Sequence, residues 1–457
     1  MTPRRDTLAA GPASSLASGP GGTRESTAPD VADLASLVVE LQARGLRVEV
    51  PLERRQGGAG PSDSGMLWVG GIPLTVPTDN ATAAGSPYVL KAEDDGYAVY
   101  RDGRRLAEAS VQRRPRFYDL TTAEGIPYWK IALLHLDSFA STVVQTCAYW
   151  GNDDQCRFCG IGVSLDAGRT IVKKTPDQLA EVACAARDLD GAVDATLTTG
   201  SSRGVDRGAR YVARCGQAVK DASGLPVEVQ FEPPADLGVL DEVAARGIDS
   251  VGIHVESFDP EVLQHVAPAK ARTGIERYFT TWERAVALFG EGQVSTYVIL
   301  GMGEDPELTV QGCRRAVDMG VLPFVVPLRP VAGSLMQDVL PPDPQYTQRI
   351  YRKVASYMID RGVSSASARA GCARCQACSG LSSVQRVLQV GRRPDLAAGP
   401  GSPRSWPSTP RARGRSSAAR LGRRSRSPTT TPSGIASSSR SRRSSSGRTG
   451  TTVTVWR

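Results

Sequence analysis

Long apolar runs are absent from this chain. No stretch reaches the roughly 18 consecutive apolar residues that a membrane-spanning helix needs. The opening residues, MTPRRDTLAAGPASSLASGPGG, lack the continuous apolar core of a secretory signal. The chain has nine cysteines, an odd number, and six of them fall into two tight triplets, unlike the paired spacing of a secreted disulfide framework. We therefore expect a cytoplasmic protein with reduced thiols and no membrane segment.

Lysine and acidic side chains are almost missing from the C-terminal part. From Leu381 onward the chain has 16 Arg, no Lys and one acidic residue, Asp395, so this part carries a charge of +15. Residues 1–380 then carry −7, although the whole chain carries +8. Because the remainder is mildly acidic, the high pI does not indicate a basic nucleic-acid groove, and we expect no nucleic-acid partner.

Both termini are predicted to be disordered. Residues 1–30 are mostly Gly, Ala, Ser and Pro, and residues 381–457 are rich in Arg, Ser and Pro. Neither segment can bury enough apolar surface to offset its chain entropy. Two interpretations of the Arg-rich tail stay open. It either binds RNA or a membrane surface, or it is an extension without selected function, for instance a shifted reading frame, which we favour.

Two ordered regions are predicted between these termini. Residues 31–140 predict a small α+β module, in which VADLASLVVELQARG has helical spacing and the Gly-Gly and Asp-Gly pairs reverse two hairpins. From residue 141 to 362, six apolar runs alternate with amphipathic helical stretches; the runs are STVVQTC, VDATLTTG, LPVEVQFEP, SVGIHVES, QVSTYVIL and LPFVVPLRP. Six such units predict an α/β fold with a parallel sheet, an open partial (β/α)6 TIM-type barrel.

Three cysteines follow the first predicted strand of this barrel. Cys147, Cys156 and Cys159 have the spacing C-x8-C-x2-C. Reactive groups collect at the carboxyl ends of strands in such folds, so a cofactor is expected here. Three thiolates on a four-iron cluster leave one iron free to bind a small molecule. A structural zinc site with a fourth ligand from elsewhere is the alternative, although the loop contains no His.

This loop resembles the cysteine loop of the radical S-adenosylmethionine (SAM) superfamily. The superfamily usually has C-x3-C-x2-C. This chain keeps the aromatic residue before the last cysteine, Phe158, and lengthens the first gap to eight residues. The turn TTG, Thr198–Gly200, resembles the segment that meets the amino group of SAM. HVES, His254–Ser257, resembles the NLET-type segment of lipoyl and biotin synthases.

Two later segments extend the resemblance. YVILGMGE, Tyr297–Glu304, is similar to the G-x-I-x-G-x-x-E element beside the adenine, except at its first Gly. PLRPVAGS, Pro327–Ser334, resembles the last strand of biotin-synthase-like members. At closer range the chain resembles an uncharacterised, biotin-synthase-related family that is found in bacteria near nitrilase-type genes.

The resemblance implies a reaction and a set of site residues. A reduced [4Fe–4S] cluster would cleave SAM to a 5′-deoxyadenosyl radical, which abstracts hydrogen from a small-molecule substrate, with an electron donor such as flavodoxin or ferredoxin. Strand alternation adds Glu232, beside Gln230, and Arg329 is a candidate partner for a carboxylate. A core histidine at position 254 and a structural ion pair at Arg329 stay open. The cofactor-contacting candidates are Phe158, Thr198, Thr199, Gly200, Glu232, His254, Glu256, Ile299, Gly301, Glu304 and Arg329.

A second cysteine triplet lies in residues 363–380. Cys372, Cys375 and Cys378 follow the last predicted helix of the barrel. An auxiliary iron–sulfur cluster with an open iron, a zinc site completed from elsewhere and an unligated group of thiols are the three interpretations. We expect this segment to cross the barrel mouth. The other cysteines, at positions 184, 215 and 313, lie singly in helical stretches, and we interpret them as core residues.

Two other classes of protein remain open on the sequence. One is a zinc-stabilised protein whose triplets are structural and whose tail binds RNA. The other is a barrel that binds SAM as a sensor without radical chemistry. The substrate does not follow from the sequence, because function depends on the site and not on the fold.

Overall fold

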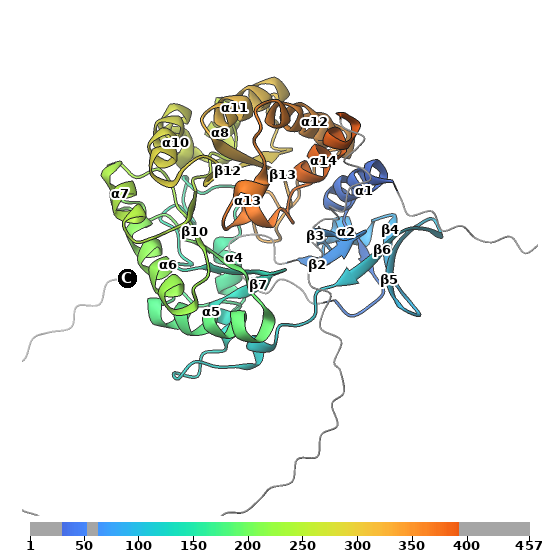
Figure 1. Ribbon diagram of the computed structural model, residues 1–457, viewed down its shortest axis with the longest axis horizontal. Coiled ribbons are helices and arrows are strands. Elements are labelled where there is room, and N and C mark those ends of the chain that lie inside the picture. The colour runs from blue at the N-terminus through green and yellow to red at the C-terminus, as the bar shows by residue number, and fades with distance from the viewer. Residues whose placement is uncertain (1–29, 53–62, 393–457) are drawn as a thin grey trace, which may run out of the picture. The chain divides into compact units, whose positions relative to one another are not determined.

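The computed structural model describes residues 30–52 and 63–392, and all of these belong to one compact unit (Figure 1). The predicted disorder of residues 1–29 and of residues 393–457 lies outside the described residues. Among the described helices, none combines the length and the apolar character that a membrane crossing requires.

The N-terminal module is an α+β unit, as the sequence predicts. Helix α1, Val31–Arg44, ends at Gly45, whose φ of +72° and close approach to Ala83 both favour glycine. A six-stranded sheet follows, with Gly-Gly and Asp-Gly at two of its hairpin turns. Its strand order is β1 (Arg47–Val48), β4 (Tyr88–Glu93), β5 (Gly96–Arg101), β6 (Arg104–Val111), β2 (Ser64–Val69) and β3 (Ile72–Pro77).

The second sheet forms the predicted partial barrel. Its strands run in chain order, β7 (Leu133–His135), β8 (Ser138–Thr142), β9 (Asp194–Thr198), β10 (Val227–Gln230), β11 (Ser250–Gly252), β12 (Val294–Leu300) and β13 (Val321–Pro327). Strands β8 to β13 pair with one another in parallel, and β7 joins β8 at the edge as an antiparallel strand. Because the order never reverses, the sheet winds in one direction, as in a TIM-type barrel, and the predicted fold class is confirmed.

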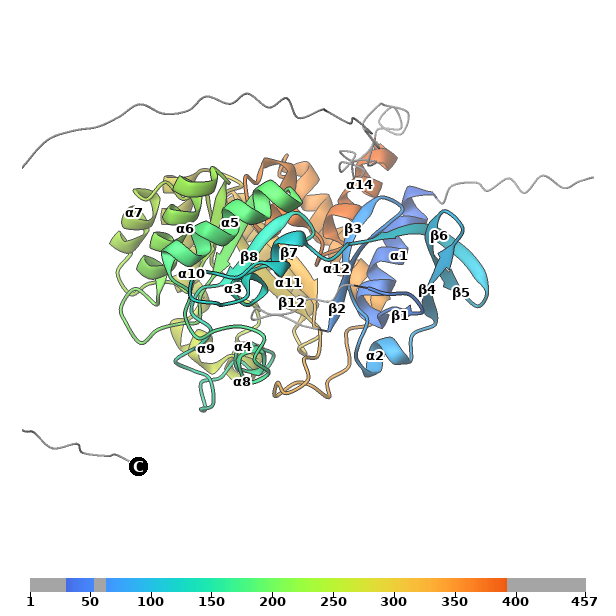
Figure 2. The same cartoon turned by 90° about the horizontal axis from the view of Figure 1, so that it is seen from below.

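Helices surround this sheet (Figures 1 and 2). They are α5 (Pro176–Asp190), α6 (Ala209–Ser223), α7 (Gly238–Ala244), α8 (Pro260–Val266), α9 (Pro268–Thr273), α10 (Ile275–Phe289), α11 (Pro306–Asp318) and α12 (Pro344–Asp360). Three of them begin with Asp-Pro, and the Asp259, Asp305 and Asp343 carboxylates each accept hydrogen bonds from two backbone N–H groups of the first turn. This arrangement satisfies free donors and places proline where no donor is needed.

The module and the barrel share a direct contact. Helix α1 packs against β3, α12 and α14 (Leu381–Arg392). The Gln42 side chain and the Thr75 backbone both donate to the Ala377 carbonyl, at 3.1 and 2.9 Å. The N-terminal sheet therefore rests on the segment that carries the second cysteine triplet.

The prediction of disorder is wrong for residues 381–392. Helix α14, Leu381–Arg392, buries Leu381 and Val384, and Gln385 donates to the Val363 carbonyl at 2.9 Å. The composition of the whole tail concealed this helix, because its apolar residues follow helical spacing over only three turns.

Removing α14 should destabilise the folded unit. A chain that ends at Gly380 should unfold with a free energy lower by about 3–5 kcal/mol than a chain that ends at Arg392, because two buried apolar side chains are lost. Urea denaturation of the two truncated chains measures the difference. Equal stabilities would show that α14 adds no packing energy.

Candidate functional site

The first cysteine loop is fixed to the barrel by backbone contacts. Ala148 N donates to Ser201 O, and Arg157 N donates to Val266 O, both at 2.8 Å. The loop also passes very close to the end of β9, since a Cβ on Gly200 would lie 2.1 Å from the Thr146 carbonyl oxygen. Only glycine fits there. Cys147 follows the end of β8 by five residues, somewhat farther than the sequence predicts.

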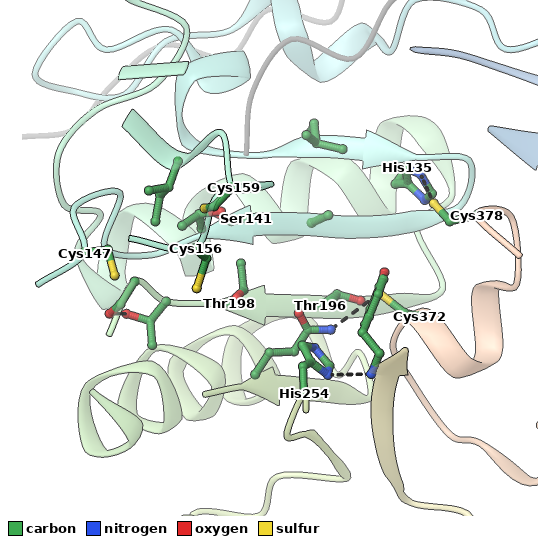
Figure 3. A pocket seen from close by; sticks show the side chains of 18 of the residues that line it. His135, Ser141, Cys147, Cys156, Cys159, Thr196, Thr198, His254, Cys372 and Cys378 are labelled. Atoms are coloured by element: carbon green, nitrogen blue, oxygen red, sulfur yellow. Dashed lines mark hydrogen bonds between the residues drawn. The ribbon is translucent and has the colours of Figure 1, made fainter. Parts of the chain in front are cut away.

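A cavity of about 370 Å³ brings the two cysteine triplets together. Cys147, Cys156 and Cys159 line one end, near the carboxyl ends of β8 and β9 (Figure 3). The second triplet lines the other end (Figure 3). Residues from the predicted SAM set lie along the same cavity; they are Phe158, Thr198, Thr199, Gly200, Glu232, His254, Glu256, Ile299 and Arg329.

Two predicted cofactor residues lie outside this cavity lining. The Glu304 carboxylate accepts from the backbone of Gly301 and Met302 and from the Tyr346 hydroxyl at 2.7 Å, so it ties the turn after β12 to α12. Gly301 has a φ of +94°, and a Cβ at this position would lie 2.8 Å from Cδ of Pro342. The structure gives both residues a role in the turn, and brings neither to the cavity.

A buried ion pair lies beside the first triplet. Lys270, on α9, donates to the Glu256 carboxylate and to the His254 carbonyl, both at 2.7 Å. Burial disfavours the Lys270 charge, but Glu256 and the other negative groups around the amine together outweigh it and raise the pKa of the amine well above its usual value. Glu256 has a φ of +69°, rare for a residue other than glycine, so its position depends on this packing and not on strand alternation.

His254 is neutral in this site. Burial, with a smaller contribution from the Lys270 charge, lowers the pKa of its ring to about 3. Nδ1 accepts from the Tyr297 backbone N–H at 3.2 Å, which places the remaining ring proton on Nε2. That Nε2 is buried and has no hydrogen-bond partner among the described residues. The ring lines the cavity and packs edge-on against Tyr297.

The first three thiols suit a soft metal cofactor. Burial raises the pKa of each, that of Cys159 to about 12, so without metal they are protonated. Iron or zinc binds the thiolate form, and loading must displace these protons. The donor set, three sulfur atoms at one end of a cavity, fits an iron–sulfur cluster with an exposed iron.

The second triplet lies at the amino-terminal side of the barrel, and the predicted placement at the mouth is wrong. Arg374, within helix α13 (Cys372–Cys375), pairs with Asp137 at 2.6 Å and with Asp194 at 2.7 Å. Asp194 is the first residue of β9, and Asp137 directly precedes β8. The chain after α12 therefore turns under the barrel and closes its lower end.

Several cavity residues escape sequence reasoning. Lys270 and Lys174 belong to no recognisable motif, and His135 lies in a three-residue strand. Lys174 is fully buried, and burial lowers the pKa of its amine to about 7. It donates to Thr142 O and Thr170 Oγ1, both at 2.6 Å. No local pattern distinguishes these residues from surface ones, because their burial follows from the packing of distant segments.

The comparisons find distant relatives. No protein-family model matches the chain. Bacteriochlorophyllide c C-7(1)-hydroxylase of Chlorobaculum limnaeum is 28% identical over 137 residues, which cover 30% of this chain and 34% of that protein. The match thus spans about a third of the curated relative's length.

The solved structures with similar folds are also distant in sequence. Methylornithine synthase (PylB) has a TM-score of 0.37 at 15% identity, over 54% of this chain and 77% of that chain. A radical SAM methyltransferase from Sphaerobacter thermophilus has a TM-score of 0.38 at 14% identity, over 61% of this chain and 75% of that chain. The hydrogenase maturase HydG from Carboxydothermus hydrogenoformans has a TM-score of 0.37 at 17% identity, over 48% of this chain and 50% of that chain. At these scores the likenesses carry no statement about activity.

The buried ion pair gives a stability test. Lys270→Met should lower the free energy of unfolding of the iron-free protein by about 3–5 kcal/mol, because Glu256 keeps a buried charge without its cation. The double variant K270M/E256Q should recover part of this loss. The surface pair Lys353–Glu307 is the matched control, and K353M should cost less than about 1 kcal/mol. Equal losses for the two lysines in urea denaturation would contradict the role of burial.

Proposed function

We propose that this protein is a radical SAM enzyme that acts on a small molecule. Cys147, Cys156 and Cys159 would hold a [4Fe–4S] cluster, and SAM would bind beside it in the cavity. The chain resembles the radical SAM superfamily in its partial barrel, its cysteine loop and its local match to a curated hydroxylase. When bound, the cluster and SAM supply a 5′-deoxyadenosyl radical that abstracts hydrogen from the substrate.

The observation that carries this proposal is the shared cavity. Nine of the eleven cofactor-contacting candidates predicted from sequence line the same cavity as the three cysteines. They come from segments as far apart as the first cysteine loop and the end of β13. Each motif was selected from sequence independently of the others, yet their residues line one cavity. Turns that matched the motifs by chance would be scattered over the fold.

The chain's own residues would bind and orient the cofactors. The TTG turn and Cys147 line the same cavity, and the amino group of SAM would meet the cluster there. Glu232, held by the Tyr149 hydroxyl at 3.1 Å, and Glu256, held by Lys270, provide carboxylates that would accept hydrogen bonds from hydroxyl or amino groups. The neutral His254 would donate through Nε2.

The size of the cavity supports a small substrate. About 370 Å³ lies at the lower end of the range for small-molecule sites. The segment that carries the second triplet closes the amino-terminal side of the barrel. A folded RNA or protein could not enter such a volume. The substrate is therefore a metabolite or a small group that reaches in from the mouth.

Loss of the first triplet should abolish SAM cleavage. The wild type, reconstituted with iron and sulfide without oxygen and reduced with dithionite, should form 5′-deoxyadenosine. The C147A/C156A/C159A variant should form less than about 1% of that amount, because it lacks the three ligands of the cluster. The C184A variant, altered at a single helical cysteine, is the control and should keep wild-type turnover. If the triple variant still cleaves SAM, or if the wild type binds SAM without cleaving it, the proposed function fails.

An arginine-rich hollow supports an acidic electron donor as partner. A depression of about 380 Å³ borders the first cysteine loop and is lined by residues that include Arg203, Arg207 and Arg272. Tyr149 lines both this hollow and the cavity, so the two are separated by little more than the loop. Flavodoxins and ferredoxins would present negative charge, and opposite charges speed such encounters.

Charge reversal at this hollow should weaken docking of the electron donor and leave the cleavage of SAM itself unaffected. The R203E/R207E variant should lower the rate of flavodoxin-driven SAM cleavage by about tenfold or more at low salt. Dithionite-driven cleavage should stay unchanged, because dithionite needs no docking surface. The R284E/R361E variant changes the net charge equally on other surfaces and should keep both rates. A parallel loss of both rates in R203E/R207E would place the two arginines in the active site instead.

A further inference from the structure

We propose that the substrate of the cavity is an organic acid and that Arg329 pairs with its carboxylate. Only the term substrate rests on the proposed function, because the cavity can bind a carboxylate with or without SAM chemistry. The sequence leaves two roles open for Arg329, a structural ion pair and a contact to a carboxylate from outside the chain. The structure separates these roles.

Arg329 has no carboxylate partner among the residues that the structure describes. It follows β13 by two residues, is half-buried and lines the cavity. Its Nη2 donates to the Thr75 carbonyl oxygen at 2.5 Å, and no Asp or Glu of residues 30–52 or 63–392 forms an ion pair with it. The guanidinium has several further N–H donors, and a single carbonyl leaves most of them available. A half-buried cation of this kind is stabilised when a ligand brings the missing anion.

Thr75 fixes this guanidinium at the cavity before any ligand binds. The backbone N–H of Thr75, on β3, donates to the Ala377 carbonyl at 2.9 Å, and its hydroxyl lies 3.0 Å from Nε2 of His135. Ala377 and His135 line the same cavity as Arg329. One residue of the N-terminal module thus contacts three residues of the cavity lining. A group that is already held in place loses little entropy when it pairs with a ligand.

Basic side chains outnumber carboxylates in the cavity lining. The lining contains five Lys or Arg side chains and two Glu side chains, an excess of three positive charges. Burial lowers the pKa of Lys174 to about 7, so this amine contributes only part of a charge at neutral pH. The basic residues are Lys130, Arg169, Lys174, Lys270 and Arg329, and the acidic ones are Glu232 and Glu256. The field in the cavity therefore favours an anionic ligand.

The proposed cofactors would leave this excess in place. SAM carries a sulfonium and an ammonium group against a single carboxylate, so it adds positive charge. An oxidised [4Fe–4S] cluster on three thiolates adds about one negative charge, which SAM offsets. The compensating anion must then come from the substrate.

Apolar neighbours favour a carboxylate over a phosphate at Arg329. Leu328 and Val331 lie beside it in the chain, are buried and line the same cavity. A carboxylate can place both of its oxygens on one side of a guanidinium through two parallel hydrogen bonds. A phosphate would keep a further oxygen and additional charge against apolar side chains, where polar groups without partners are costly.

A matched pair of aromatic probes tests the charge of the ligand. Benzoate and benzamide have nearly the same shape, but only benzoate is an anion. The full chain, reconstituted with iron and sulfide without oxygen and titrated by calorimetry, should bind benzoate at least about tenfold more tightly than benzamide. Phenyl phosphate should bind more weakly than benzoate. SAM should not displace benzoate.

Variants assign this preference to one side chain. R329Q should lose the preference for benzoate and bind benzamide and SAM as the wild type does, because only the charged pair is removed. R329K should keep part of the preference. The control is R284Q, at an exposed arginine on α10 that pairs with Asp241, and it should behave as the wild type.

The other outcomes overturn the proposal. Equal affinities for benzoate and benzamide in the wild type would show that the cavity does not select an anion, and this comparison needs no variant that could misfold. Tighter binding of phenyl phosphate would exclude a carboxylate as the preferred group. A preference that persists in R329Q would exclude Arg329 as its partner. Displacement of benzoate by SAM, with weaker SAM binding in R329Q, would assign Arg329 to the carboxylate of SAM.

The proposed function can fail separately. If the wild type neither binds nor cleaves SAM but keeps a benzoate preference that depends on Arg329, only the radical SAM assignment is wrong. If SAM is cleaved and benzoate binds no better than benzamide, only the class of substrate is wrong.

Discussion

The partly buried guanidinium of Arg374 holds three parts of the chain together. It pairs with Asp137 before β8 and with Asp194 at the start of β9, and it belongs to the segment that carries the second triplet. The Asp194 carboxylate is fully buried, and a buried charge that loses its partner is strongly destabilising. Because Ala377 in the same segment accepts bonds from Gln42 and Thr75, the N-terminal module is fixed to this point as well.

This constraint makes the barrel a chamber with two chemically different ends. The mouth, at the carboxyl ends of the strands, carries three cysteines next to the Lys270–Glu256 pair. The floor carries three cysteines and a histidine, over the neutral side chain of Glu228, whose pKa burial raises to about 8.

The protonation states of His254 and Lys270 in this cavity are fixed by their surroundings. His254 is kept neutral by burial and by the Lys270 charge, so it can donate but not carry a proton across the site near neutral pH. Lys270 stays charged beside the first triplet because Glu256 and the other surrounding negative groups together outweigh the cost of burial. A bound cluster with three thiolates adds negative charge there, and the lysine is placed to offset part of it.

The sequence alone determined the local elements and the first cysteine loop. Helix spacing, Asp-Pro starts and Gly-containing hairpins depend on neighbouring residues, and the six parallel strands follow from them. Only the tertiary structure decided which distant side chains meet. It placed the second triplet at the floor and not at the mouth, beside His135, and it kept Gly301 and Glu304 out of the cavity. Contacts between residues 240 positions apart arise from packing of whole elements, which no local pattern encodes.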